Sequence, residues 1–143
     1  MKNIYLLYIA ALCIKRNERG LISVDMKRVL LVDDQAAIRR LISEVLEEDF
    51  NIMSASNGED AVGVAEKFKP DVILLDIGLP GISGIDLIPI FKEISPKSKI
   101  LMLTGSISNS TMNQAKSLGV SGFIEKPFDI LEIKNEIMYI LQQ

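Results

Sequence analysis

Five short apolar runs, each followed by an amphipathic helix pattern, constrain the fold of this chain more than any other feature. The runs lie at residues 28–32, 50–55, 71–75, 99–103 and 121–125. Runs this short and rich in Val, Ile and Leu are typical of buried parallel strands. In the first helix the apolar stripe consists of Ile38, Leu41, Ile42, Val45 and Leu46. Strands that alternate with such helices predict an α/β fold, with a parallel sheet covered on both faces.

Capping residues and helix breakers set the expected ends of the helices. Asn57 and Ser83 each precede a helix pattern, where a side-chain oxygen can accept a hydrogen bond from a free backbone N–H group. Asp129 and Glu132 form a capping-box pattern at the start of the last helix. Pro89 lacks a backbone N–H group, so we expect a kink or a late start in the third helix. The fourth helix is expected over residues 107–118.

The composition excludes several classes of protein. The 143 residues suit one domain, and hydrophobic residues make up 48% of them, enough for a buried core. The net charge of -3 gives no support for general nucleic-acid binding. The chain has no histidine and a single cysteine, Cys13, which excludes Ser-His-Asp triads, histidine-ligated metals and internal disulfides. Its chemistry must therefore use Asp, Glu, Lys, Ser, Thr and backbone groups.

Residues 1–25 stand apart from the repeating pattern, so we assign the domain to residues 26–143. Residues 4–14 form an unbroken apolar run of 11 residues. As a helix this run would span roughly 16 Å, about half of a bilayer core. Three interpretations stay open: an extension with no role in the domain, a hydrophobic helix docked on the domain or on a second copy, or a membrane-associated segment.

Polar residues follow four of the five predicted strands at the point where each strand ends. Asp33 and Asp34 follow the first strand, Asp76 the third, Thr104 the fourth and Lys126 the fifth. Each one alone could be an ordinary turn residue or helix cap. Because the carboxyl ends of parallel strands lie on one edge of a sheet, we expect the whole set to share one cleft there.

Three clustered carboxylates would repel one another, and a divalent cation with a preference for oxygen ligands would resolve that repulsion. Mg²⁺ is the natural choice, and a bound metal invites a phosphate group. Asp76 should be ionised at neutral pH and could attack phosphorus directly, forming an aspartyl phosphate. Lys126 and Thr104 would then stabilise the phosphoryl oxygens.

Four segments of the sequence, "VLLVDD", "VILLDIGLPGISG", "ILMLTG" and "GFIEKPF", stand in a recognisable order. Together they resemble the signature segments of the CheY-like receiver domain of response regulators in two-component signalling. The resemblance covers residues 26–143. It implies a doubly wound, flavodoxin-like (βα)5 fold, with a parallel five-stranded sheet in the order 2-1-3-4-5.

The resemblance also implies roles for the acidic residues. Asp76 matches the phosphoacceptor, which would take phosphate from a phosphohistidine donor. Asp33 and Asp34 match the acidic pair that organises Mg²⁺, for which Mn²⁺ is a substitute. Gly78 matches the residue whose backbone carbonyl completes the metal site with Asp76.

The remaining signature positions concern the switch that follows phosphorylation. Thr104 matches the switch hydroxyl and Lys126 the phosphate-contacting lysine. The bond between Lys126 and Pro127 resembles the cis peptide of the family. Phe123 occupies the position of the switch aromatic, although a plain buried aromatic explains it nearly as well.

The resemblance further implies a set of partners and a place in the cell. The donor would be a histidine kinase or a histidine phosphotransfer protein in the cytoplasm. The output would be a protein target or a dimer contacting the fourth helix, fifth strand and fifth helix. We expect no direct nucleic-acid binding, and membrane contact only through residues 4–14. The chain would catalyse only its own phosphorylation and dephosphorylation, either as a stand-alone receiver or as a fragment lacking an output domain.

Three other functions were weighed against this one. An aspartate-nucleophile phosphatase would carry a second Asp two residues after the nucleophile, where this chain has Gly78. A flavin-binding module would need a hydroxyl- and glycine-rich phosphate loop after the first strand, where this chain has Asp33 and Asp34. A scaffold that never uses its phosphosite would not need the full set of acidic, hydroxyl and lysine residues.

Overall fold

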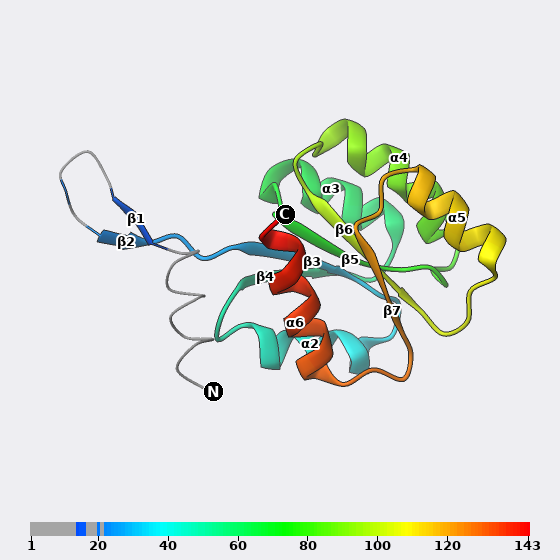
Figure 1. Ribbon diagram of the computed structural model, residues 1–143, viewed down its shortest axis with the longest axis horizontal. Coiled ribbons are helices and arrows are strands. Elements are labelled where there is room, and N and C mark those ends of the chain that lie inside the picture. Colours follow the sequence, from blue (N-terminus) through cyan, green and yellow to red (C-terminus); the bar gives the residue numbers. More distant parts are fainter. Residues whose placement is uncertain (1–13, 17–19, 21) are drawn as a thin grey trace.

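A parallel five-stranded sheet forms the centre of the computed structural model, which describes residues 14–16, 20 and 22–143 (Figure 1). The strands are β3 (Arg28–Val32), β4 (Asn51–Ala55), β5 (Val72–Asp76), β6 (Lys99–Thr104) and β7 (Gly122–Glu125). They lie in the order β4-β3-β5-β6-β7, which is 2-1-3-4-5 when these five are counted along the chain. All four pairings are parallel, so the predicted fold is confirmed.

Five helices cover the two faces of this sheet. They are α2 (Ala36–Leu46), α3 (Gly58–Phe68), α4 (Gly84–Ile94), α5 (Asn109–Ser117) and α6 (Ile130–Leu141). Buried side chains of α2 and α6 share one core cluster, and those of α3, α4 and α5 share the other. Adjacent residues of β3 divide between the clusters, because successive side chains of a strand point to opposite faces. The fold is therefore a three-layer sandwich with two cores.

The central strand β5 shows why the apolar runs are continuous. Its four apolar residues, Val72–Leu75, are fully buried, because helices cover the strand on both faces. Burying one such side chain contributes about 1.5–3 kcal/mol to the stability of the fold. A strand with one face in water would instead have alternated with polar residues.

Most helix ends follow the predicted caps. The side chains of Asn57 and Ser83 accept hydrogen bonds from backbone N–H groups in the first turns of α3 and α4. The expected late start of α4 was wrong, because the Ser83 cap starts the helix at once and Pro89 lies inside it on the exposed side. Helix α5 begins at Asn109, later than predicted, because Ser108 caps it.

A short antiparallel hairpin precedes the sheet. Strands β1 (Ile14–Arg16) and β2 (Ile22–Val24) pair with each other and form a separate two-stranded sheet. In Figure 1 this hairpin projects away from the layered body. Residues 4–13 of the predicted hydrophobic helix lie outside the described residues, and Ile14 lies in a strand, so the assignment of residues 1–25 stays a prediction. Across the part of the chain that is described, no helix is long and apolar enough to span a membrane.

Candidate functional site

The candidate site lies at the edge of the sheet where the parallel strands end. Asp33 directly follows β3, Asp76 is the last residue of β5, Thr104 is the last residue of β6 and Lys126 directly follows β7. Three of these side chains touch one another, since the ammonium of Lys126 contacts both carboxylates. The sheet topology thus places side chains from distant parts of the sequence in contact.

Asp33 is fully buried and held by several contacts. Its Oδ1 accepts a hydrogen bond from the backbone N–H of Gln35 at 2.8 Å, and its Oδ2 lies 3.2 Å from Nζ of Lys126. Its backbone N–H donates to the carbonyl oxygen of Ala55 at 3.2 Å, which ties it to β4. The carboxylate is therefore fixed in position before any ligand arrives.

The charges of the site perturb one another. Burial raises the pKa of the Asp33 carboxyl, and the nearby charge of Asp76 raises it further, against the lowering effects of the Gln35 N–H and of Lys126. Burial alone would lower the pKa of Lys126, but the charges of Asp33 and Asp76 outweigh it and raise that pKa. One ammonium thus compensates two carboxylates, and the site retains an excess of negative charge.

Asp76 is buried at the end of β5, with 6% of its surface exposed. Its Oδ1 accepts a hydrogen bond from the backbone N–H of Gly78 at 3.0 Å, and its Oδ2 lies 3.3 Å from Nζ of Lys126. Both oxygens therefore have a donor that orients them. The position of the Gly78 carbonyl relative to a metal stays a prediction.

The acidic residues form a group suited to a cation. Asp33, Asp34 and Asp76 each offer a carboxylate oxygen, and these oxygens lie within 4.8 Å of one another. Asp34 is exposed while the other two are buried, so the group opens to solvent on one side. Carboxylate oxygens with room for water are the ligands that Mg²⁺ prefers. The residues present therefore fit this metal.

Thr104 and Phe123 lie on the neighbouring strands β6 and β7, and Lys126 directly follows β7. Thr104 is buried, and its carbonyl oxygen accepts a hydrogen bond from the backbone N–H of Lys126 at 2.6 Å. The peptide bond between Lys126 and Pro127 is cis. Phe123 is half-buried and packs against the core that β7 shares with α3, α4 and α5.

Sequence reasoning missed two residues that support the site. Arg39 donates a hydrogen bond from Nη1 to the carbonyl oxygen of Asp33 at 2.8 Å and so fixes the acidic loop to α2. Gly84 packs so closely on β5 that an added Cβ would lie 2.5 Å from the carbonyl oxygen of Asp76. The sequence indicates these two residues only weakly. Arg39 is a cationic residue in the helix after the acidic pair, and Gly84 directly follows the Ser83 cap.

Comparisons with known proteins agree with this geometry. Chemotaxis protein CheY of Halobacterium salinarum is 36% identical over 116 residues, which cover 80% of this chain and 97% of that protein. The structure of a CheY-like receiver domain protein from Methanospirillum hungatei has a TM-score of 0.79 at 27% identity, over 82% of this chain and 94% of that one.

A third similar structure carries a modified aspartate. It is a response regulator protein from Burkholderia pseudomallei with a phosphorylated aspartic acid, a calcium ion and citrate. Its TM-score is 0.74 at 27% identity, over 81% of this chain and 69% of that one. The response regulator receiver domain family itself matches residues 29–138, nearly the whole layered body. The chain therefore belongs to the response regulator receiver domain family.

Proposed function

We propose that the chain is a phosphoacceptor switch in a two-component phosphorelay, with Asp76 as the residue that takes the phosphoryl group. One observation carries the proposal. The Asp76 carboxylate is oriented by Gly78 and Lys126, and one of its oxygens lies within 4.8 Å of oxygens of Asp33 and Asp34. The phosphorylated aspartic acid of the similar protein from Burkholderia pseudomallei supports the same chemistry here.

The phosphoryl transfer needs little from the protein beyond positioning and charge. An oxygen of Asp76 attacks phosphorus, and the bond from phosphorus to the donor's imidazole nitrogen breaks. Lys126 already contacts Oδ2 of Asp76 and can follow the charge onto the phosphoryl oxygens. The 143 residues contain no histidine, so the phosphohistidine lies outside them, on a histidine kinase or a histidine phosphotransfer protein.

Asp33, Asp34, Asp76 and the backbone carbonyl of Gly78 would hold Mg²⁺. When bound, the ion would neutralise charge on the carboxylates and on the phosphoryl oxygens. Mn²⁺ would substitute, since it also takes oxygen ligands. The carboxylate oxygens of Asp33, Asp34 and Asp76 lie within 4.8 Å of one another, which supports this assignment.

Phosphorylation would then change the surface that partners contact. A phosphoryl group on Asp76 would accept a hydrogen bond from the hydroxyl of Thr104, and Phe123 on the adjacent strand would shift with it. These residues lie on β6 and β7, next to α5 and α6 (Figure 1). The face formed by α5, β7 and α6 is therefore the proposed contact for an output protein or a dimer partner in the cytoplasm. The chain acts on itself and turns over no external substrate.

A small phosphodonor such as acetyl phosphate, supplied with Mg²⁺, tests the proposal directly. Intact-protein mass spectrometry should show one phosphate on the wild type and on a Glu66→Gln control, and none on Asp76→Asn. Glu66 is an exposed carboxylate on α3, away from the cleft. An unmodified wild type, or equal labelling of Asp76→Asn, would disprove the assignment of Asp76.

A further inference from the structure

Strand β4 leaves one edge of the sheet open. It is the terminal strand in the order β4-β3-β5-β6-β7 and pairs only with β3 in the described sheet. Natural edge strands are commonly protected by charged residues or proline, yet the five residues of β4, "NIMSA", include neither. Met53 at the centre of the strand is 43% exposed. Among the described residues, nothing pairs with the outer side of β4, so this side can pair with another strand.

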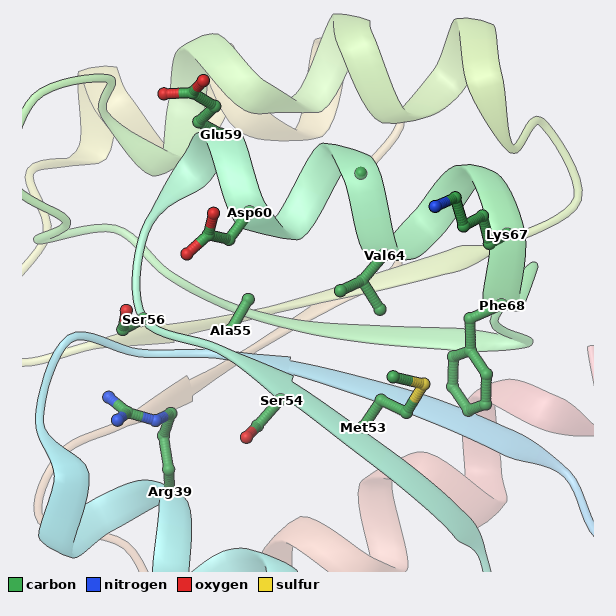
Figure 2. Close-up of a pocket in the computed structure, with 11 residues that line it drawn as sticks. Arg39, Met53, Ser54, Ala55, Ser56, Glu59, Asp60, Val64, Lys67 and Phe68 are labelled. Carbon is green, nitrogen blue, oxygen red and sulfur yellow. The ribbon is translucent and has the colours of Figure 1, made fainter.

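Charged side chains of α3 flank this edge, with acidic residues near one end and a basic residue near the other. Figure 2 shows the groove that β4 forms with α3, with Glu59 and Asp60 toward the Ser56 end and Lys67 toward the Phe68 end. All of these residues line the groove. The α3 side of the edge is thus acidic at one end and basic at the other.

On the opposite face of the sheet, the charges of α2 and of the residue that follows it run in the reverse order along β4. Arg39 lines the groove beside Ser54 and Ser56, at the end where α3 is acidic. Glu47, about two turns further along the chain, lines the surface beside Asn51 and Ile52. Each end of β4 therefore has one sign of charge on the α3 face and the opposite sign on the α2 face.

A two-fold axis beside the outer edge of β4, normal to the sheet, would match these charges. Such an axis pairs β4 with itself as an antiparallel strand and keeps each helix on its own face. With Met53 opposite Met53 of the second copy, Lys67 of one copy meets Glu59 and Asp60 of the other. On the opposite face, Arg39 of one copy meets Glu47 of the other. We propose that two copies of this chain associate through β4 and form a continuous ten-stranded sheet.

The charge order favours a second copy over an unrelated peptide. A peptide would need its own matching charges, whereas this chain already carries both halves of every pair on the two ends of one edge. Like charges placed opposite each other disfavour association, so a single charge reversal should weaken it. The proposed interface lies at β4 and is separate from the proposed output face of α5, β7 and α6 at the other edge.

A charge-swap experiment on the full chain tests the pairing. Lys67→Glu alone and Glu59→Lys alone each place like charges opposite each other, so either variant should weaken dimerisation at least about tenfold. A mixture of the two variants restores an opposite pair on both sides of the axis and should form heterodimers with an affinity near that of the wild type. Analytical ultracentrifugation gives the oligomeric state, and circular dichroism checks that each variant is folded.

Three results would overturn the proposal. The wild type could remain monomeric up to about 1 mM, which would leave the edge to another occupant such as an extended peptide. Either single variant could dimerise as well as the wild type. The mixture could remain monomeric although both folded variants are present.

Cross-linking tests the register independently. Directly opposed residues of an antiparallel pair have Cα atoms about 4.5–5.5 Å apart, which a disulfide can span. In a Cys13→Ser background, Met53→Cys should therefore form a covalent dimer under mild oxidation. Glu93→Cys, an exposed position on α4 outside both proposed interfaces, is the matched control and should remain monomeric. Equal cross-linking at both positions would contradict the register.

Discussion

Replacing Asp34 with asparagine should change the stability of the domain in opposite directions with and without Mg²⁺. Asp34 is the exposed member of the acidic group, and no ion pair of the described structure involves it, unlike Asp33 and Asp76. The Asp34→Asn substitution therefore removes two carboxylate repulsions while it leaves the contacts of Lys126 in place. It also removes one of the proposed metal ligands.

The distances set the size of the effect. Two unit charges 4.8 Å apart, the greatest separation within the group, repel by about 0.9 kcal/mol at the dielectric constant of water. Two such pairs amount to about 1.7 kcal/mol, and salt screening at physiological ionic strength reduces the gain to about 1 kcal/mol. Without metal, the melting temperature of Asp34→Asn should therefore exceed that of the wild type by about 3–5 °C.

With Mg²⁺ present, the wild type should instead be more stable than Asp34→Asn. Mg²⁺ at about one hundred times its dissociation constant would stabilise the wild type by about 2.7 kcal/mol, and the variant binds the ion more weakly. Thermal unfolding in EDTA and then in a Mg²⁺ titration measures both effects. Glu66→Gln, which removes an exposed charge from α3, should behave like the wild type throughout. A variant that is less stable than the wild type in EDTA, or equally stabilised by Mg²⁺, would refute the reasoning.

Two further predictions concern packing and pH. Gly84→Ala should cost about 1–3 kcal/mol in unfolding free energy, because its Cβ would lie 2.5 Å from the carbonyl oxygen of Asp76. Gly78→Ala is the matched control for urea denaturation and should be tolerated, because its Cβ would meet only Oδ1 of Asp76 at 3.7 Å. The raised pKa of Lys126 stabilises the fold below the ordinary value of 10.5, and this contribution should be lost as pH rises through the raised pKa. Above pH 10.5, Lys126→Met should therefore lose less stability with rising pH than the wild type does. Lys116→Met, an exposed control, should lose as much as the wild type.

The central part of the fold could be predicted because its signals are local. The strand Val72–Leu75 lies between two helical layers, so every one of its side chains had to be apolar, and that pattern is visible without a structure. The caps at Asn57 and Ser83 accept hydrogen bonds from N–H groups within three residues, so they too could be predicted from the sequence. The grouping of Asp33, Asp34 and Asp76 followed from parallel strand direction alone.

The features that were missed depend on distant or competing contacts. The need for glycine at Gly84 arises because the backbone of β5 approaches α4, and hydrophobic patterning carries no trace of that approach. Arg39 acts on a backbone carbonyl, which any residue at position 33 would offer. Hydrophobicity alone favoured a helix up to Ile14, whereas pairing of Ile14 with Val24 places it in a hairpin.

The contact between Lys126 and Asp33 joins residues 93 positions apart in the sequence. During synthesis, the acidic pair and Asp76 leave the ribosome well before the strand that carries the lysine. A chain that stops short of β7 therefore lacks the internal counter-ion of its own acidic cluster. Under the proposed function, competence to accept phosphate would arise only when the last strand has joined the sheet, and an unfinished or truncated chain would not compete with finished copies for the donor.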